Sequence, residues 1–519
     1  MHRMVLPLVL AMGTALVGCA SLFNLDDYGF TGDGDASPGP ARGEDGAPTP
    51  TQDGAMPTVD AGPACRVNAE CIGTAEDPSV CVKATGTCAK VKSPDCTHVI
   101  GDVTKDDAVL LGALLGNDAS LERAATLAAE EITAGGRPIV IVACETTSRT
   151  MDASRHLVDD LHVPAIVGPL AADDVVIATQ QISAKGGSLL MTPTALASSI
   201  AQLADDGLTW RAVPADGQRA KLVIQQLNEL ENVIHVVHAT NVVKLGIVHR
   251  GDAFGTSARD AISGKLIING KFINDPANAG NVSDDAYPKA NDGAALQAIV
   301  NKYANTFKPD VVYLTSEEQV TGVMVPLEAA LTVARAVNRP YYVLTDALKN
   351  KTLLDAIAAG SMPSDIKRRI RGVGVRPDTT SSPVHAAFEA AYTTRWGAAP
   401  TSFESAFVYD ATYAVALGVA AGGATGPSTA KGLRALGVGD GYSVGTKDVG
   451  AVLGRLGQKQ SVSLRGTFAL MQWDQSGDIA AGTLEVWCVG GASAPVFGSS
   501  GQTMDVLTQV VGGSFVQCQ

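Results

Sequence analysis

The sequence of 519 residues has no run of basic residues and no alternation of aromatic with basic residues, and its formal net charge is −14. Because nucleic-acid-binding proteins hold phosphates through such features, nucleic acid is not an expected partner. An acidic surface mainly favours solubility. Hydrophobic residues make up 46% of the chain and charged residues 18%, which is the composition of a globular protein with room for two or three domains.

Catalytic and metal-binding motifs are also scarce. The chain contains neither an HExxH zinc motif nor a phosphate-binding loop, and no motif fixes a pair of acidic residues. We therefore expect no enzyme, no catalytic residue and no cofactor. No CxxC pair occurs, and no histidine lies among the closely spaced cysteines, so we also expect no metal site.

The N-terminus carries a signal for export. A short basic start at residues 1–3 is followed by an apolar stretch at 5–18, which is too short to span a bilayer. The stretch ends in Leu16-Val17-Gly18-Cys19, which matches the bacterial lipobox. The match implies that 1–18 is a lipoprotein signal peptide and that Cys19 carries acyl chains, palmitate among them, which anchor the protein to a membrane. An ordinary secretory signal peptide with a chance cysteine is the alternative.

The residues after the predicted anchor favour the cell envelope. Ala20 and Ser21 follow Cys19, with no aspartate, which by the Gram-negative sorting rule resembles an outer-membrane destination. No later stretch reads as a membrane-spanning helix, so the remainder is expected outside the cytoplasm. Residues 19–64 are rich in Gly, Pro and acidic residues and predict a disordered linker, which spans on the order of 35 Å. A specific partner-binding tail is the alternative.

Cysteines are dense between residues 65 and 96, in a stretch with few core-forming residues. In an exported protein this pattern predicts a small disulfide-rich module. With Cys19 lipidated, eight cysteines remain, which is an even count. Spacing alone does not determine connectivity. Our prediction pairs Cys65 with Cys81, Cys71 with Cys88, Cys96 with Cys144, and Cys488 with Cys518.

The stretch 163–196 predicts a βαβ unit around which the rest of the chain is organised. Residues 165–167 read as a short buried strand that Gly168-Pro169 ends, 175–183 as the crossover helix, and 189–191 as the next strand. In open α/β sheets, ligands lie beyond the carboxyl ends of the strands. An ordinary βαβ unit of an α/β enzyme is the alternative interpretation.

Small and hydroxyl residues follow both of these strands. They are Leu170-Ala171-Ala172 after the first and Thr192-Pro193-Thr194-Ala195 after the second. Small side chains let backbone groups approach a ligand, and the N-terminus of the following helix favours an anionic group such as a carboxylate.

Strands and helices alternate from residue 108 onward, which predicts parallel sheets. Two series of such units, separated by a chain crossover, predict two lobes with a cleft between them. Residues 466–473 and 482–487 are predicted to form a terminal β-hairpin. Further strands are predicted at 108–112, 139–143, 243–248, 309–314, 341–345 and 372–375. Helices are predicted at 121–132, 155–161, 221–230, 257–266, 296–307, 322–336, 385–396 and 405–421.

An ordered set of stretches between residues 104 and 489 resembles a known family, the type I periplasmic binding proteins of the Leu/Ile/Val-binding class. These are the substrate-binding components of branched-chain amino-acid ABC importers. The matching stretches are LAAEEITAGGRPIVIV (127–142), AIVGPLA (165–171), TPTA (192–195), WRAVPADGQRAK (210–221), VKLGIVHRGDAFGTS (243–257), KPDVVYL (308–314), SFESAFVYDATYAVALGVAA (402–421) and LRGTFALMQWDQSGDI (464–479).

The resemblance implies an α/β fold of two Rossmann-like lobes with parallel sheets, joined by three crossovers and closing on a ligand by a hinge motion. The implied binding-protein domain covers 104–489, and residues 490–519 follow it as a C-terminal tail. Lobe 1 is expected to hold about 104–215 and 375–480, and lobe 2 about 216–374.

The resemblance also implies ligand-binding residues in lobe 1, but this sequence departs from the family there. Leu170 falls at a backbone-contact position, whereas Ala172 stands where a ligand-binding serine is usual. Thr192, Thr194 and Ala195 match the family's hydroxyl-rich turn, in which Leu196 replaces a threonine.

Two hydroxyl donors to a ligand carboxylate are therefore missing. Thr194 and Asp173 are the expected substitutes, although Asp173 would repel a carboxylate. A carboxylate buried without paired donors is costly to hold.

In lobe 2 the resemblance implies three ligand-binding residues. Phe254 matches an aromatic position, and Asp346 matches the acidic residue that holds a ligand ammonium, with a solvated loop aspartate as the alternative. Glu317 falls near a family aromatic position and favours a cationic or polyhydroxylated ligand. A basic amine, an amide and a neutral polar molecule therefore stand beside an amino acid as expected ligands.

Two functions remain open on this basis. The first is a lipid-anchored solute-binding protein that captures a small polar ligand for an ABC importer, with a permease as its protein partner. The second is an envelope-anchored sensing or scaffold module without a dedicated importer.

Overall fold

The computed structural model describes residues 64–519 except 72, 75, 147–148, 186, 291 and 379–380. The described residues belong to one compact unit, Asp60–Gln519. The predicted signal peptide (1–18), the predicted lipid-anchor residue Cys19 and all but the last residue of the predicted linker lie outside the described residues.

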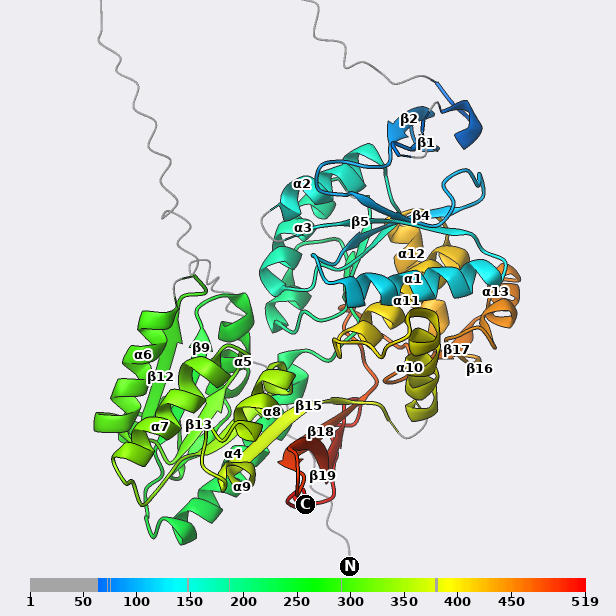
Figure 1. Ribbon diagram of the computed structural model, residues 1–519. Helices are drawn as coiled ribbons and strands as arrows, with labels where there is room; N and C mark the ends of the chain where they lie inside the picture. Colours follow the sequence, from blue (N-terminus) through cyan, green and yellow to red (C-terminus); the bar gives the residue numbers. More distant parts are fainter. Residues whose placement is uncertain are drawn as a thin grey trace, which may run out of the picture. The chain divides into compact units, whose positions relative to one another are not determined.

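Lobe 1 is built on a six-stranded sheet in the order β3-β5-β4-β6-β7-β8, in which only the edge strand β3 is antiparallel (Figure 1). The strands are β3 (His98–Ile100), β4 (Val109–Leu114), β5 (Ile139–Cys144), β6 (Ala165–Val167), β7 (Leu189–Thr192) and β8 (Thr209–Arg211). Because β3 precedes residue 104, the lobe begins earlier than expected.

Helices cover both faces of this sheet. One face packs against α1 and α11 and the other against α2 and α3, because successive strand residues point to opposite faces. The helices are α1 (Ala119–Ala134), α2 (Thr150–Arg155), α3 (Ala172–Lys185), α10 (Ser382–Trp396), α11 (Ser405–Gly422), α12 (Gly426–Leu433) and α13 (Val449–Gly457), with a π-helical turn η2 (His156–Asp160) and a 3-10 turn η3 (Ser198–Gln202). A small parallel pair, β16 (Asp440–Ser443) and β17 (Val462–Arg465), lies near α13.

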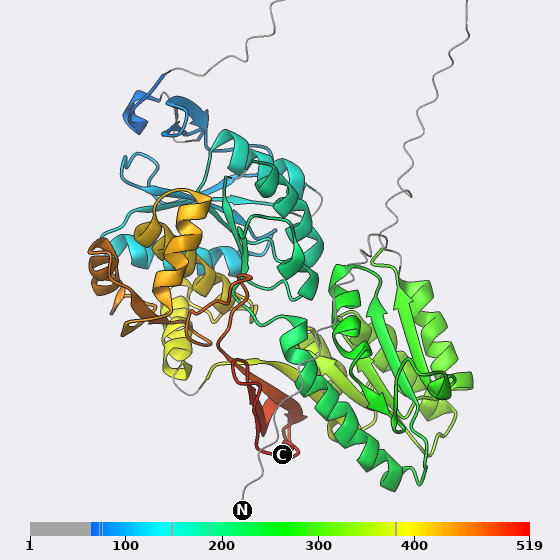
Figure 2. The ribbon, with the colours of Figure 1, turned by 180° about the vertical axis from the view of Figure 1, so that it is seen from behind.

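Lobe 2 is built on an eight-stranded sheet in the order β12-β9-β13-β14-β15-β18-β19-β20. Strands β12 to β15 pair in parallel, and β18 to β20 add an antiparallel extension beside β15 (Figures 1 and 2). The strands are β9 (Leu245–Arg250), β12 (Val282–Tyr287), β13 (Val311–Leu314), β14 (Tyr341–Thr345), β15 (Ile370–Arg376), β18 (Thr483–Gly490), β19 (Val496–Asp505) and β20 (Val511–Gly512).

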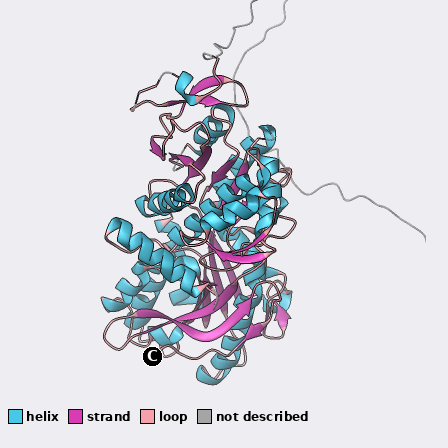
Figure 3. Ribbon diagram, turned by 90° about the vertical axis from the view of Figure 1, so that its right-hand side faces the viewer, coloured by secondary structure: helices cyan, strands magenta, loops and turns pink. Residues whose placement is uncertain are grey.

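Alternation along the strands again places helices on both faces. In β13, Val311 and Tyr313 join the apolar cluster under α4 and α5, whereas Val312 and Leu314 join the cluster under α6 and α7. Figure 3 shows the strands enclosed by helices. The helices are α4 (Asp216–Val237), α5 (Ala253–Ser263), α6 (Gly293–Lys302), α7 (Val325–Val333), α8 (Lys351–Ala358) and α9 (Ile366–Arg369), with π-helical turns η5 (Tyr303–Phe307) and η6 (Val320–Met324) and a 3-10 turn η7 (Asp346–Leu348). A short hairpin, β10 (Ile267–Ile268) and β11 (Lys271–Phe272), follows α5.

The chain passes between the lobes three times, as the resemblance implies. The crossovers lie between β8 and α4, between β15 and α10, and between β17 and β18. The mixed α/β architecture with parallel-dominated sheets is therefore the predicted one.

The predicted terminal hairpin is wrong. Thr483–Gly490 (β18) pairs with Val496–Asp505 (β19) and not with residues 466–473. The latter segment is held on lobe 1 by side chains, since Trp473 Nε1 donates to Arg211 O at 2.8 Å and its ring lies 5.7 Å from that of Trp210. Residues 490–519 are accordingly no separate tail, because β19 and β20 complete the lobe 2 sheet.

The extension is joined tightly to the parallel part of its sheet. Gly372 of β15 faces Trp487 of β18, and a Cβ at Gly372 would lie 1.8 Å from the indole. A glycine is therefore required at that position for the buried indole to lie flat against β15.

One buried helix resembles a membrane span in composition. Ser405–Gly422 (α11) is long and apolar enough to cross a membrane, contrary to our expectation for this part of the chain, yet 83% of it is buried inside the protein. The central position of α11 against α1 and the lobe 1 sheet accounts for its apolar composition.

All four predicted disulfide bonds are confirmed. The structure joins Cys65 to Cys81, Cys71 to Cys88, Cys96 to Cys144, and Cys488 to Cys518. The first two close the small module that holds β1 (Ser79–Val82) and β2 (Thr87–Lys90). The third ties the end of the module to β5, and the last ties the C-terminus to β18.

The module is also fastened to lobe 1 by Asn68. Its amide nitrogen donates to Val103 O at 2.9 Å and Lys105 O at 3.2 Å, and its amide oxygen accepts from Cys81 N at 2.9 Å. The module therefore has a defined contact with lobe 1, made by Asn68.

Replacing Asn68 with alanine should weaken the contact between the module and lobe 1 without unfolding the lobes. The substitution leaves partly buried backbone groups unpaired, which costs about 1–3 kcal/mol. Hydrogen exchange should rise in β1 and β2 while the main melting transition stays in place. Thr74→Ala is the control, since the Thr74 hydroxyl accepts only a local bond, from Asp77 N. Equal exchange in the two variants would contradict the assigned role of Asn68.

Candidate functional site

The predicted ligand-binding residues all follow parallel strands at their carboxyl ends. Leu170, Ala172 and Asp173 follow β6, and Thr192, Thr194 and Ala195 lie at or after the end of β7. Phe254, Glu317 and Asp346 follow β9, β13 and β14 in lobe 2. In doubly wound sheets this edge is where ligands bind.

The lobe 1 hydroxyls hold the loops to each other. Thr192 Oγ1 donates to Pro169 O at 2.6 Å, and Thr194 Oγ1 donates to Leu170 O at 2.8 Å. Ala172 and Ala195 are each 1% exposed and pack in an apolar cluster. These loops therefore present backbone more than hydroxyl donors to the cleft, which disfavours a ligand held by its carboxylate.

Asp173 lies where the lobes touch. Its Oδ1 accepts from Ala253 N, at the start of α5, at 3.3 Å, and its Oδ2 lies 3.6 Å from Lys289 Nζ. Its charge is thus engaged by lobe 2 in this arrangement.

Phe254 stands on the lobe 2 side, one residue into α5. Its ring is partly buried, and the Arg250 guanidinium lies 4.9 Å from the ring centroid. Arg250 in turn pairs with Asp252 at 2.6 Å. The aromatic ring is therefore held in place by a neighbouring cation.

Asp346 is paired with a buried arginine. Arg219 Nη1 donates to Asp346 Oδ2 at 2.6 Å, and the two side chains are 6% and 14% exposed. Arg219 Nε also donates to Pro214 O at 3.0 Å. A ligand ammonium at Asp346 would share that carboxylate with Arg219.

Three carboxylates, drawn from both lobes, act on the side chain of Glu404. Desolvation is the largest influence on Glu404, and the negative charges of Asp118, Asp346 and Glu317 add to it, so that the pKa of Glu404 rises to about 7. Asp118 and Glu404 come from lobe 1, and Glu317 and Asp346 from lobe 2. The Glu404 residue is exposed, so solvent screens part of this effect.

Sequence reasoning missed the two lobe 1 carboxylates. Asp118 is the N-cap of α1 in the loop after β4, where its side chain accepts from Ser120 N at 2.7 Å. Glu404 directly precedes α11, and its neighbour Phe403 is 42% exposed. A signal was present, since an acidic residue after a parallel strand such as β4 falls at the ligand-binding edge.

Glu404→Gln should stabilise the ligand-free protein at pH 8 and have little effect at pH 5. A carboxyl whose folded pKa is raised to about 7 costs stability as the pH rises from its unfolded value toward 7, and glutamine removes that cost. Calorimetric melting at both pH values checks the prediction. The outcome that contradicts it is an equal change at both pH values.

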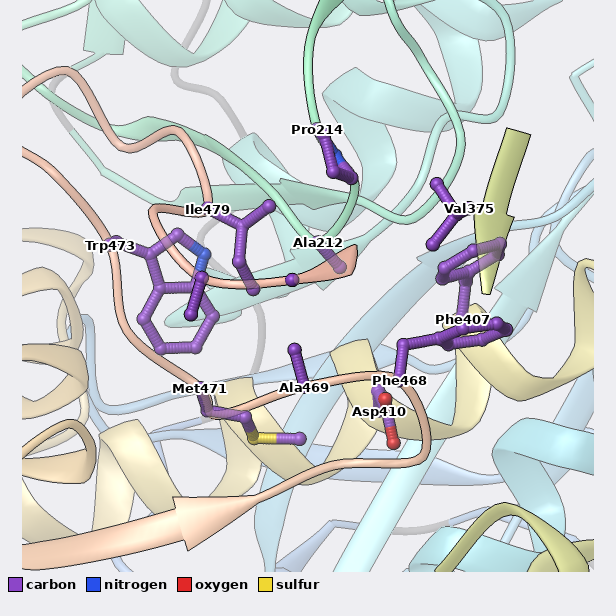
Figure 4. Close-up of a pocket in the computed structure, with 12 residues that line it drawn as sticks. Ala212, Pro214, Val375, Phe407, Asp410, Phe468, Ala469, Met471, Trp473 and Ile479 are labelled. Atoms are coloured by element: carbon purple, nitrogen blue, oxygen red, sulfur yellow. The ribbon is translucent and has the colours of Figure 1, made fainter. Parts of the chain in front are cut away.

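An apolar hollow lies close to the three crossovers. It has an empty volume of about 410 Å³ and an apolar lining, with Phe407 and Phe468 on one side and Trp473 on the other (Figure 4). Ala212 and Gly482 come from the first and third crossovers, and Val375 comes from the end of β15, just before the second. This hinge pocket includes none of the predicted ligand-binding residues.

Two further arrangements are structural. Residues 441–445 spell GYSVG, a match to the GxSxG pattern, but Ser443 ends the two-stranded β16–β17 pair, and its backbone N donates to Asp448 Oδ2 at 2.9 Å. Within the described residues, the one group with metal-ligand spacing is Cys65, Cys71 and Cys81, whose sulfurs form disulfide bonds.

Comparison with known proteins bears on the fold. No protein-family model and no curated protein matches the sequence. Solved structures match well. The leucine-binding protein LivK of Thermotoga maritima aligns over 75% of this chain and 97% of its own, with 15% identity and a TM-score of 0.54. The branched-chain amino-acid-binding protein LivJ of Streptococcus pneumoniae, in complex with isoleucine, aligns over 76% and 99%, with 14% identity and a TM-score of 0.53.

A third structure binds a different class of ligand. The ABC transporter solute-binding protein of Rhodopseudomonas palustris BisB5, in complex with 3,4-dihydroxybenzoic acid, aligns over 78% of this chain and 99% of its own, with 14% identity and a TM-score of 0.55. Identities this low define architecture and not ligand. The chain has the type I periplasmic binding protein fold that these solute-binding proteins share.

Proposed function

We propose that the protein is a lipid-anchored, extracytoplasmic solute-binding protein that captures a small polar ligand with a protonated amine, such as an amino acid, for delivery to an ABC importer. The observation that carries the proposal is Glu404, whose pKa is raised by burial and by the negative charges of Asp118 in lobe 1 and of Asp346 and Glu317 in lobe 2. A ligand cation placed among these carboxylates would offset that repulsion.

Closure of the lobes follows from the same arrangement. Asp118 and Glu404 stand on one lobe, and Glu317 and Asp346 on the other, so a cation contacts both sets only when the cleft is closed. Ligand binding then shifts an open–closed equilibrium by its differential affinity for the closed state. Phe403 and Phe254 offer aromatic surface that would cover the rest of the ligand.

The membrane placement of the proposal rests on the sequence alone. Acylation of Cys19 would anchor the chain, with the outer membrane favoured, and the linker would let the binding domain reach a permease or a surface partner. The lipobox and the linker support this placement.

The sensing or scaffold module without a dedicated importer remains the second candidate. The observation that favours it is the disulfide module, which is seated on lobe 1 through Asn68 and tied there by Cys96–Cys144. An anchored recognition surface would use such a module, whereas ligand delivery needs only the two lobes. Genes for a permease and an ATPase beside this gene would favour the importer role, and an isolated gene the sensing role.

Thermal unfolding of the oxidised protein, with Cys19→Ser to keep it in solution, tests the proposed ligand class. Free amino acids, amides, polyamines and sugars form the panel. A ligand at a hundred times its Kd stabilises by about 2.7 kcal/mol. The proposal expects a shift with an amine and none with uncharged sugars. Glu130→Gln, which removes an acidic side chain from an exposed ion pair with Arg395 on lobe 1, is the control that should keep the shift.

A further inference from the structure

Polar contacts run from the cleft carboxylate Asp346 to a contact between the lobes. Arg219 bonds Asp346 at 2.6 Å and lies beside Asp216, the first residue of α4 after the first crossover. Ser257 of α5 lies close to the Asp216 carboxyl and acts to lower its pKa. The Ser257 hydroxyl oxygen also accepts from the backbone N of Ser198, in lobe 1, at 2.9 Å. We call these five residues the polar relay.

Asp216 is the unusual member of the relay. Its side chain is buried, with the residue 6% exposed, and its Oδ2 has no hydrogen-bond partner among the described residues. Asp216 lines a hollow with an empty volume of about 270 Å³ between α4, α5 and the lobe 2 sheet, together with Arg219 and Tyr313. A buried carboxylate oxygen without a donor is costly, so this one is poised to accept a cation.

The far end of the relay holds the lobes together. Ser198 of η3 donates its backbone N–H to Ser257 and accepts from Gly217 N through its own hydroxyl at 2.9 Å. Asp216 N donates to Leu196 O, also in lobe 1, at 2.9 Å. A serine hydroxyl has a single donor, so the Ser257 proton is free to point toward Asp216 while its oxygen accepts from Ser198.

We propose that Arg219 and Asp216 couple the cleft to this contact, so that neutralising Asp346 moves Arg219 onto Asp216 and changes how firmly the lobes hold each other. Arg219 is one cation between two carboxylates. While Asp346 is free, Arg219 stays with it at 2.6 Å and Asp216 Oδ2 lacks a partner. A ligand ammonium that binds Asp346 neutralises the Asp346 carboxylate. The Arg219 guanidinium is then free to move to the unpaired Oδ2 of Asp216. Both are positioning residues, acting through Asp346 and Ser257.

The coupling can be measured without a ligand, because a change of pH protonates or deprotonates Asp216. The pKa of Asp216 is raised to about 6, chiefly by burial; Arg219, Ser257 and Arg211 act to lower it, and Asp346 acts to raise it. Tyr313 is uncharged near neutral pH, because burial raises its pKa above the usual value. Above pH 6 the ionised carboxylate attracts the Ser257 hydroxyl proton, and below it that attraction weakens. Acid should therefore loosen the Ser257–Ser198 contact.

The test measures the distance between the lobes in the ligand-free full chain as a function of pH, by energy transfer between dyes. The dyes are attached to unnatural residues at two exposed positions, Arg123 of α1 and Asn301 of α6, which leaves the native disulfides intact. Wild-type protein should show a distance change with its midpoint near pH 6. Asp216→Asn should abolish that change. Asp346→Asn should lower the midpoint by at least about one pH unit, because Arg219 then pairs with Asp216.

Control variants separate the relay from other contacts. Asp173→Asn removes a different contact between the lobes, to Ala253 N and Lys289, and should leave the midpoint unchanged. Ser257→Ala should give the loosened distance at every pH, and it decides the question if Asp216→Asn does not fold. A midpoint that persists in Asp216→Asn, or that does not move in Asp346→Asn, would overturn the proposal. The inference shares the cleft of the proposed function, but its test uses no ligand, so the two can fail separately.

Discussion

Asp346→Ala should weaken binding of the amine ligand by at least about tenfold, or about 1.4 kcal/mol. The substitution removes the lobe 2 carboxylate that closes on the ligand. The melting temperature of the ligand-free protein should change little at pH 8, because Arg219 keeps a second carboxylate, Asp216, within reach. Titration calorimetry with the amine that the panel identifies, together with melting of the ligand-free variant, checks both parts.

A double substitution tests why Asp346→Ala should cost the ligand-free protein little stability. Asp216→Asn combined with Asp346→Asn leaves the buried Arg219 with no carboxylate, and breaking a buried pair on one side costs about 3–5 kcal/mol. The double variant should therefore lose far more stability than the sum of the two single variants. Unaltered affinity in Asp346→Ala would remove Asp346 from the site, and additive losses would contradict the sharing of Arg219.

Glu328→Gln should destabilise the protein by about 3–5 kcal/mol, a large loss for one substitution. Glu328 is completely buried under lobe 2, where Arg369 donates to both of its oxygens at 2.7 and 2.9 Å and Tyr342 donates at 2.9 Å. Arg339 adds a further bond at 2.8 Å. Glutamine keeps the shape and removes the charge, which leaves the buried Arg369 guanidinium with only the half-exposed Asp365 carboxylate as a counter-charge.

Urea unfolding measures this loss, and Asp365→Asn is the matched control. Asp365 also bonds Arg369, at 2.8 Å, but its side chain is 51% exposed. Exposed ion pairs contribute about 0–1 kcal/mol, so the control should lose little. Similar losses in the two variants would mean that burial is not what makes the Glu328 pair strong.

The strands whose bounds the sequence pattern predicted best are short and largely buried. The bounds of β6 (165–167) and β14 (341–345) are as predicted, because continuous apolar runs between turn residues leave little choice of boundary. The edge strand β12 was missed, because Val282–Tyr287 carries two aspartates and no apolar run. It pairs because β9 offers a free parallel edge, which local sequence does not reveal.

The prediction of the terminal hairpin was wrong for a different reason. Residues 466–473 look strand-like, but Trp473 docks on Trp210 and Arg211 in lobe 1, while Thr483–Gly490 finds its partner further along the chain. Pairing between segments separated by a loop is decided by tertiary contacts and not by local preference.

Part of the candidate site could be found from sequence, because strand ends mark the ligand-binding edge. Glu317 and Asp346, which the family resemblance implied, do follow such strand ends, and Asp118 was not predicted although it follows β4. Glu404 lies far along the chain, before a helix, and only the folded structure brings it near the other three carboxylates. The ion pair between Asp346 and Arg219 could not be predicted from the sequence either, because nothing in the sequence distinguishes Arg219 from other arginines in helices.

The most direct test of the central claim, that the cleft holds a protonated amine, is thermal unfolding with matched ligand pairs. Each amino acid is compared with the hydroxy acid that has oxygen in place of its amine, at pH 8, using the Cys19→Ser protein and its Glu317→Gln/Asp346→Asn variant. We expect the melting temperature to rise with an amino acid, not with the matching hydroxy acid, and with neither ligand in the variant. Equal rises with both members of a pair, or a rise that survives in the variant, would contradict it.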